Sequence, residues 1–73
     1  MRDVLKSARK NAGMTQQAVA DKLGISLRYY QDIEAGSLMG SIWVWDALED
    51  LLGEHQRTLR KQEESHRGQE ASQ

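Results

Sequence analysis

The 73-residue chain is 38% hydrophobic and 29% charged, with no Cys and no Pro. A chain of this length has room for one small core, and without Cys it holds neither a disulfide framework nor a thiolate metal site. Its longest apolar run, Ile42 to Trp45, is far below the roughly 20 residues that span a bilayer, so we expect a cytoplasmic protein with no membrane partner.

The formal net charge of −1 hides an uneven distribution. Residues 1–25 carry five basic and two acidic side chains, whereas residues 26–53 carry one basic and five acidic ones. Basic surfaces are the usual footprint of nucleic-acid binding. We therefore expect the positive first third of the chain to face a nucleic acid.

The apolar positions recur at intervals of three and four residues, which predicts an all-α fold, a compact bundle of four to five short helices. The first helix is predicted over residues 2–12, ending at Gly13. Thr15, Ser26 and Ser41 are good N-cap residues for helices over 16–23, 27–34 and from 42 to about Gly53. In the last helix, the stripe predicted to face the core is formed by Ile42, Trp45, Leu48, Leu51 and Leu52.

The composition changes after Gly53, which predicts a domain over residues 1–53 and a polar extension over 54–73. We expect the fourth helix to continue through Arg60, supported by a Glu54–Arg57 pair. The remaining residues are expected to be disordered, or ordered only against a partner, because Leu59 is the only aliphatic side chain larger than Ala in the extension.

The spacing between residues 16 and 33 is typical of two short helices joined by a tight glycine turn. Gly24 suits a positive φ, and Ile25 fills the angle between the helices. The chain here resembles the phage Cro and cI repressor class, also called the XRE family. The resemblance is carried by Leu5-Lys6-Ser7-Ala8-Arg9, Gly13-Met14-Thr15-Gln16, Val19-Ala20-Asp21-Lys22-Leu23-Gly24-Ile25-Ser26 and Ile33-Glu34-Ala35-Gly36. It implies a lambda-repressor-like bundle whose second and third helices form a helix-turn-helix.

The resemblance also implies double-stranded DNA as the partner and identifies the residues that contact it. Gln16 corresponds to a glutamine that reaches a phosphate, and Arg28 is the candidate for a bidentate guanine contact. Asp32 also falls at a groove-facing position, where an acid has no evident purpose apart from accepting a bond from cytosine. The full predicted set is Thr15, Gln16, Gln17, Ser26, Leu27, Arg28, Tyr29, Asp32 and Ser37.

Two further features have structural interpretations. Arg9 and Glu34 match a pair that forms a partly buried ion pair in the family, and Tyr30 is expected in the core with a partner for its hydroxyl. Trp43 falls off the predicted inward stripe. We interpret Leu38, Met39, Trp43 and Ala47 as a homodimer interface, with Trp43 folded over its own domain as the alternative.

These features predict a small sequence-specific transcriptional regulator, a phage or mobile-element repressor that binds a palindromic operator as a dimer and blocks a promoter. The alternative is a helix-turn-helix fold used as a protein-interaction module: an antirepressor, an antitoxin-like partner or an assembly subunit. No arrangement of residues suggests catalysis, a cofactor or a small-molecule ligand. His55 and His66 are eleven residues apart and predict no metal site.

Overall fold

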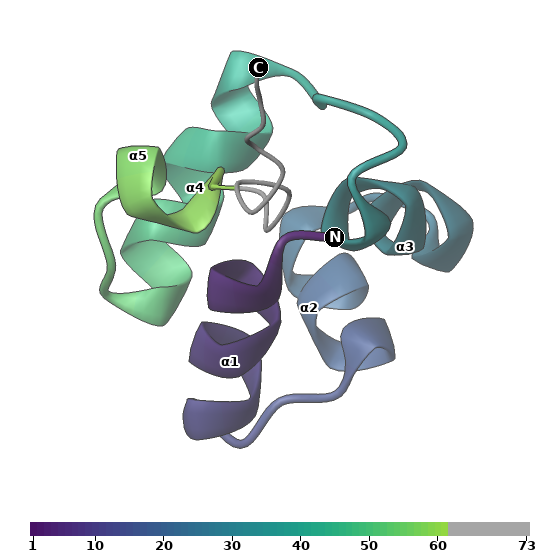
Figure 1. The fold of residues 1–73 in the computed structure, drawn as a ribbon. Helices are drawn as coiled ribbons and strands as arrows, with labels where there is room; N and C mark the ends of the chain where they lie inside the picture. Colours follow the sequence, from purple (N-terminus) through teal and green to yellow (C-terminus); the bar gives the residue numbers. More distant parts are fainter. Residues whose placement is uncertain (62–73) are drawn as a thin grey trace, which may run out of the picture.

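A computed structural model describes residues 1–61, and it contains five helices in that range (Figure 1). Their bounds are α1 (Asp3–Asn11), α2 (Gln16–Leu23), α3 (Leu27–Ala35), α4 (Ile42–Leu52) and α5 (Gln56–Leu59). The predicted all-helical bundle is confirmed. No helix among these residues is long and apolar enough to cross a membrane.

The starts of α2 and α3 are set by hydroxyl caps. Thr15 Oγ1 accepts from the Ala18 amide at 3.0 Å, and Ser26 Oγ accepts from the Tyr29 amide at 3.0 Å. Each cap satisfies one of the amides that a first helical turn leaves without a partner. Ser41 has the extended backbone of an N-cap, but its buried hydroxyl makes no hydrogen bond within the described residues.

A left-handed glycine makes the turn between α2 and α3. Gly24 has φ 73°, and the Ile25 amide behind it donates to the Ala20 carbonyl at 3.0 Å. A side chain at this φ would be strained, so glycine permits the reversal that packs α2 against α3. The result is a helix-turn-helix.

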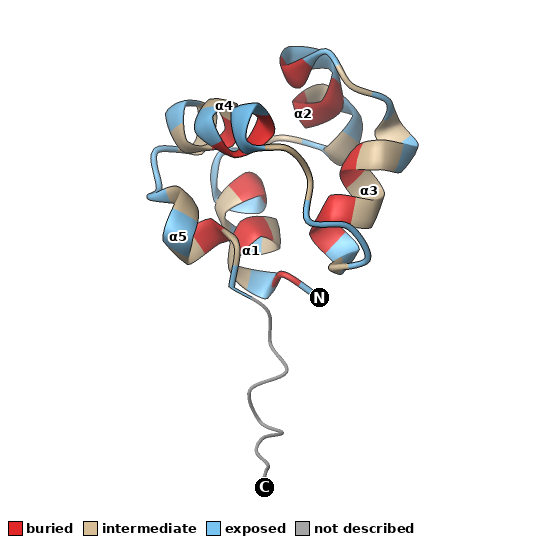
Figure 2. Ribbon diagram, turned by 90° about the horizontal axis from the view of Figure 1, so that it is seen from above, coloured by how far each residue is buried: buried red, intermediate tan, exposed pale blue. Residues whose placement is uncertain are grey.

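All five helices direct their buried faces toward one core, seen as the red segments in Figure 2. Trp45 lies in this core and is 1% exposed, and its Nε1 donates to the Met39 carbonyl at 2.7 Å. The buried hydrophobic residues are Leu5, Val19, Ala20, Leu23, Tyr30, Ile33, Val44, Trp45, Leu48 and Leu59.

The predicted inward stripe of α4 was wrong at its first turn. Val44 is fully buried, whereas Ile42 is 73% exposed. Val44 lies one turn before Leu48 on the face that meets the core, while Ile42 begins the helix at the surface. Leu51 and Leu52 are half-buried and pack against the core edge.

The expected continuation of α4 through Arg60 was also wrong. Gly53 ends α4 in the left-handed conformation, and α5 follows as a separate helix packed against α1 and α4 (Figure 1). Leu59 is fully buried there, so the core extends beyond residue 53. The predicted disorder of the C-terminal residues falls largely on 62–73, which lie outside the described residues.

The burial of Leu59 makes α5 part of the folded unit. We predict that Leu59→Ala lowers the free energy of unfolding by about 2–5 kcal/mol, because a cavity remains between α1, α4 and α5. Urea denaturation followed by Trp fluorescence measures this. Arg57→Ala, at an exposed site on the same helix, is the control and changes stability by less than about 0.5 kcal/mol. Equal stability of Leu59→Ala and wild type would contradict the assigned packing.

Candidate nucleic-acid interface

A buried ion pair joins α1 to the last turn of α3. Arg9 donates from Nε to Glu34 Oε2 at 2.8 Å and from Nη2 to Oε1 at 3.2 Å. Arg9 is 7% exposed and Glu34 3%. A third donor, Arg9 Nη1, bonds the Met14 carbonyl at 2.9 Å and so holds the segment that leads into α2.

Two more side chains donate to the same carboxylate. The Tyr30 hydroxyl donates to Glu34 Oε2 at 2.7 Å, and Gln16 Nε2 donates to Oε1 at 2.9 Å. We call Arg9, Gln16, Tyr30 and Glu34 the Glu34 cluster. Burial alone would raise the pKa of Glu34, but the hydrogen bonds from Arg9, Tyr30 and Gln16 outweigh it and hold that pKa below its usual range. Burial, with the carboxylate beside it, raises the pKa of Tyr30, which stays a neutral donor.

Gln16 also connects this cluster to a second residue of α3. Its Oε1 accepts from Gln31 Nε2 at 3.2 Å, so the start of α2 is bonded to α3 at two points. A side-chain amide has two N–H donors, and Glu34 uses one of them. The phosphate contact that the sequence predicts for Gln16 would use the second.

Arg28 is an exposed member of the predicted contact set, with 83% of its side chain accessible. Its Nε lies 3.2 Å from Asp32 Oδ2, one helical turn along α3. Asp32, whose acidic side chain was unexplained at a groove-facing position of the sequence, is therefore the ion-pair partner of Arg28. The i,i+4 spacing of the two residues was a signal for this pair.

The remaining predicted contact residues lie at the start of α2, on the first turn of α3 and just after α3. Gln17 is exposed and donates from Nε2 to Asp21 at 2.9 Å. Leu27 and Tyr29 are half-buried in the first turn of α3, and Tyr29 packs against the core edge. Ser37 is exposed just after α3, and its amide donates to the Asp32 carbonyl at 2.9 Å. Thr15 and Ser26 are the exposed caps described above.

The expectation that the positive first third faces a nucleic acid requires correction. Arg2 is 1% exposed, and Arg9 is buried against Glu34, so neither guanidinium contributes to the surface. Lys10 and Lys22 remain exposed. The burial of Arg2 had no signal in the sequence, because its partners are main-chain carbonyls that lie far away along the chain.

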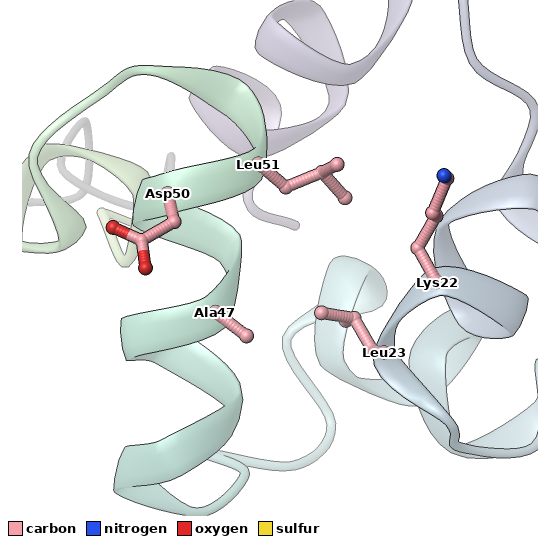
Figure 3. A pocket seen from close by; sticks show the side chains of 5 residues that line it. All are labelled: Lys22, Leu23, Ala47, Asp50 and Leu51. Carbon is pink, nitrogen blue, oxygen red and sulfur yellow. The ribbon is translucent and has the colours of Figure 1, made fainter.

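The residues predicted as a dimer interface separate into two sites. Leu38, Met39 and Trp43 are 41%, 60% and 52% exposed, and Ile42, next to Trp43 in the chain, is exposed as well. We call these four residues the 38–43 patch. Ala47 instead lines a surface hollow of about 290 Å³ between α2 and α4 (Figure 3). The other residues lining the hollow are Lys22, Leu23, Asp50 and Leu51.

The structure describes one of the two histidines. His55 Nδ1 accepts from the Arg57 amide at 3.1 Å and caps α5. His66 lies outside the described residues. Residues 1–61 contain no cluster of His, Asp and Glu side chains suited to a metal ion.

Comparison with known proteins agrees with this geometry. Residues 5–39 match a family model described as Helix-turn-helix. Comparison with curated proteins and with solved structures finds no match. Residues 5–39 form a Cro/cI-type, or XRE-family, helix-turn-helix domain, the DNA-binding unit of regulators of this type.

The Glu34 cluster makes the domain sensitive to acid. The pKa of Glu34 is lower in the folded than in the unfolded chain, so its contribution is complete above the unfolded value near 4.5 and is lost as the pH falls through the folded value. We predict that Glu34→Gln, which leaves Arg9 without its counter-charge, costs about 3–5 kcal/mol at pH 7 and loses less stability in acid than wild type.

Urea denaturation at a series of pH values from 7 to 3 measures both effects. Asp50→Asn, at an exposed position on α4, is the control and follows the wild-type pH profile. If the stability of Glu34→Gln fell with pH in parallel with that of wild type, another carboxyl group would be the cause of the stability lost in acid.

Proposed function

We propose that this protein is a repressor of phage or mobile-element type that binds a palindromic operator in the cytoplasm as a homodimer and blocks a promoter. The match of residues 5–39 to the helix-turn-helix family supports the DNA-binding part of the proposal. The exposed residues on α3 and the 38–43 patch support the sequence-specific and dimeric parts.

The observation that carries the proposal is the exposure of Arg28 on a helix whose inner face is rigidly held. The Glu34 cluster and the Gln16–Gln31 bond hold α3, while 83% of the Arg28 side chain is accessible one residue after the helix begins. A guanidinium exposed on a helix held in this way can donate to guanine N7 and O6 in the major groove. Arg28 is therefore the proposed base-reading residue.

The Arg28–Asp32 ion pair does not prevent this role. An exposed pair contributes about 0–1 kcal/mol, whereas a bidentate contact to guanine contributes about 1–3 kcal/mol of discrimination. Exchange of the carboxylate for guanine is therefore favourable. Asp32, released from Arg28, can accept from a cytosine amino group on the same groove edge.

Phosphate contacts are proposed at the starts of α2 and α3. The Ser26 hydroxyl oxygen accepts from Tyr29, which leaves its hydrogen free to donate to a phosphate. The free N–H of Gln16 has the same use, and the first-turn amides of both helices favour an anion. These contacts set the orientation of α3 on the duplex.

The 38–43 patch is the proposed dimer contact. Two copies must place their α3 helices about 34 Å apart to read half-sites separated by one turn of DNA. A symmetric contact between two such patches would cover Trp43 and Met39, which are otherwise exposed to water. Ala47 lies in the neighbouring hollow and is a weaker candidate for this contact.

One observation favours the second candidate, a protein-interaction module. The structure buries Arg2 and Arg9 and exposes four large apolar side chains in the 38–43 patch. This surface has less positive charge and more apolar area than the sequence alone suggests. Such a surface suits a protein partner, as in an antirepressor, an antitoxin-like protein or an assembly subunit. The first experiment below separates the two candidates.

We predict that the purified protein selects a palindrome from random duplex DNA, with an affinity that falls as salt increases. Arg28→Ala costs about 1–3 kcal/mol on the selected operator and relaxes base preference at one symmetric position. Arg57→Ala, an equal charge change on α5, is the control and keeps the wild-type preference. Unchanged binding by Arg28→Ala would exclude this base contact, and no DNA retained even at low salt would favour the interaction module.

We predict that Trp43→Gln raises the dissociation constant of the dimer at least tenfold, because a Trp at the centre of an interface typically contributes about 2 kcal/mol or more. Sedimentation velocity over a range of concentrations measures the change. Asp50→Asn, at an exposed site on the same helix, is the control. Identical dissociation of Trp43→Gln and wild type would place the dimer contact elsewhere.

A further inference from the structure

Arg2 has an environment unlike that of any other basic residue in the described chain. Its side chain is 1% exposed, and its partners are main-chain oxygens, a thioether and an aromatic ring. Nη1 donates to the carbonyls of Ile33 and Leu38, and Nε donates to the Arg60 carbonyl at 3.2 Å. The guanidinium carbon lies 5.2 Å from the centre of the Trp45 ring.

Helix ends compensate part of this buried charge. Ile33 lies in the last turn of α3, and Arg60 is the C-cap of α5. The carbonyls at a helix C-terminus carry partial negative charge, and the face of an indole ring attracts a cation. Burial and the nearby Arg60 cation lower the pKa of Arg2, but an arginine remains protonated throughout the neutral range.

The same residue joins α3, which carries Arg28 and is the proposed recognition helix, to the 38–43 patch. The Arg2 amide donates to the Glu34 carbonyl at 2.9 Å, so its main chain and its side chain both hold the end of α3. On the other side, Nη1 donates to the Leu38 carbonyl at 2.9 Å and Nη2 lies 3.7 Å from Met39 Sδ. Leu38 and Met39 are members of the patch.

The link between α3 and the patch is tightly packed as well as hydrogen-bonded. A Cβ built on Gly40, which has φ 82°, would lie 3.0 Å from Ile33 Cδ1 and 3.5 Å from Trp45 Nε1. Trp45 in turn donates to the Met39 carbonyl. Residues 38–40 are therefore held between α3 and α4, with the Arg2 guanidinium as a polar partner of both Leu38 and Met39.

We propose that Arg2 is a positioning residue that sets the angle between the recognition helix and the dimer contact, and thereby the half-site spacing that the dimer reads. The inference rests on the proposed function. Successive base pairs are about 3.4 Å apart along the helix axis, so a small rotation of α3 about the patch changes which spacing fits both subunits. The planar fork of Arg2, which reaches several acceptors at once, resists that rotation.

The test uses the full chain and a library of palindromes in which the distance between half-sites varies one base pair at a time. Arg2→Met keeps a long apolar stem beside Trp45 and removes all the side-chain donors. Arg2→Lys keeps the charge but replaces the planar guanidinium by an ammonium group. This variant is used for the test if Arg2→Met does not fold. Arg57→Met is the matched control, since Arg57 is exposed on α5. Circular dichroism and cooperative unfolding identify the folded variants.

Wild type and Arg57→Met are expected to prefer one spacing. In the folded Arg2 variant, the preference over spacings one base pair longer or shorter falls about fivefold or more, the smallest effect typical of one wrong base pair. The salt dependence of binding stays at the wild-type value, because no phosphate contact is removed. In hydrogen exchange, the Ser37 and Leu38 amides, both bonded to the Asp32 carbonyl, exchange faster in the Arg2 variant than in Arg57→Met.

An Arg2 variant that retains the wild-type spacing preference, with or without a uniform loss of affinity, would overturn the inference while the proposed function stands. Arg2→Met and Arg2→Lys that both fail to fold would also overturn it, because Arg2 would then serve folding alone. A wild-type protein that selects no palindrome would overturn the proposed function itself, and the inference with it.

Discussion

The arrangement of the first three helices depends on one ionised carboxylate. Glu34 accepts hydrogen bonds from Arg9 on α1, Gln16 on α2 and Tyr30 on its own helix. A buried polar group without partners is costly, so each donor is satisfied only while the helices keep this arrangement. Apolar packing among Leu5, Val19 and Ile33 supplies most of the driving force, but such contacts tolerate small shifts. The directional bonds to Glu34 select one geometry among those that the core would allow.

Arg2, a further buried charged residue, acts on the same turn of α3 from another side. Arg2 binds the carbonyls of Ile33 and Glu34, while the Glu34 side chain binds the first two helices. The last turn of α3 is therefore fixed, and its first turn, with Arg28, is left accessible. This division suits a helix that must present its start to a partner. The buried charges of Arg2, Arg9 and Glu34 are all matched by hydrogen bonds, which is the condition under which a charge is tolerated in a core.

The net charge of the chain is a poor guide to its surface. Arg2, Arg9 and Glu34 are buried, and Arg28 is paired with Asp32 on α3. In the proposed complex, the DNA backbone would contact the first-turn amides of α2 and α3, together with polar groups such as Gln16 and Ser26. Local geometry rather than total charge therefore supports the family's mode of binding in this protein.

The sequence by itself determined α1, α2 and α3, the Thr15 and Ser26 caps, the Gly24 turn and the helix-turn-helix family, because each depends on residues within one or two turns of one another. The Arg28–Asp32 spacing was also visible in it. Only the tertiary structure decided the burial of Arg2, the exposure of Ile42 and the docking of Leu59. These depend on which surfaces of distant helices remain open once the bundle has formed, and on main-chain carbonyls that every residue carries. No pattern of side chains along the chain encodes them.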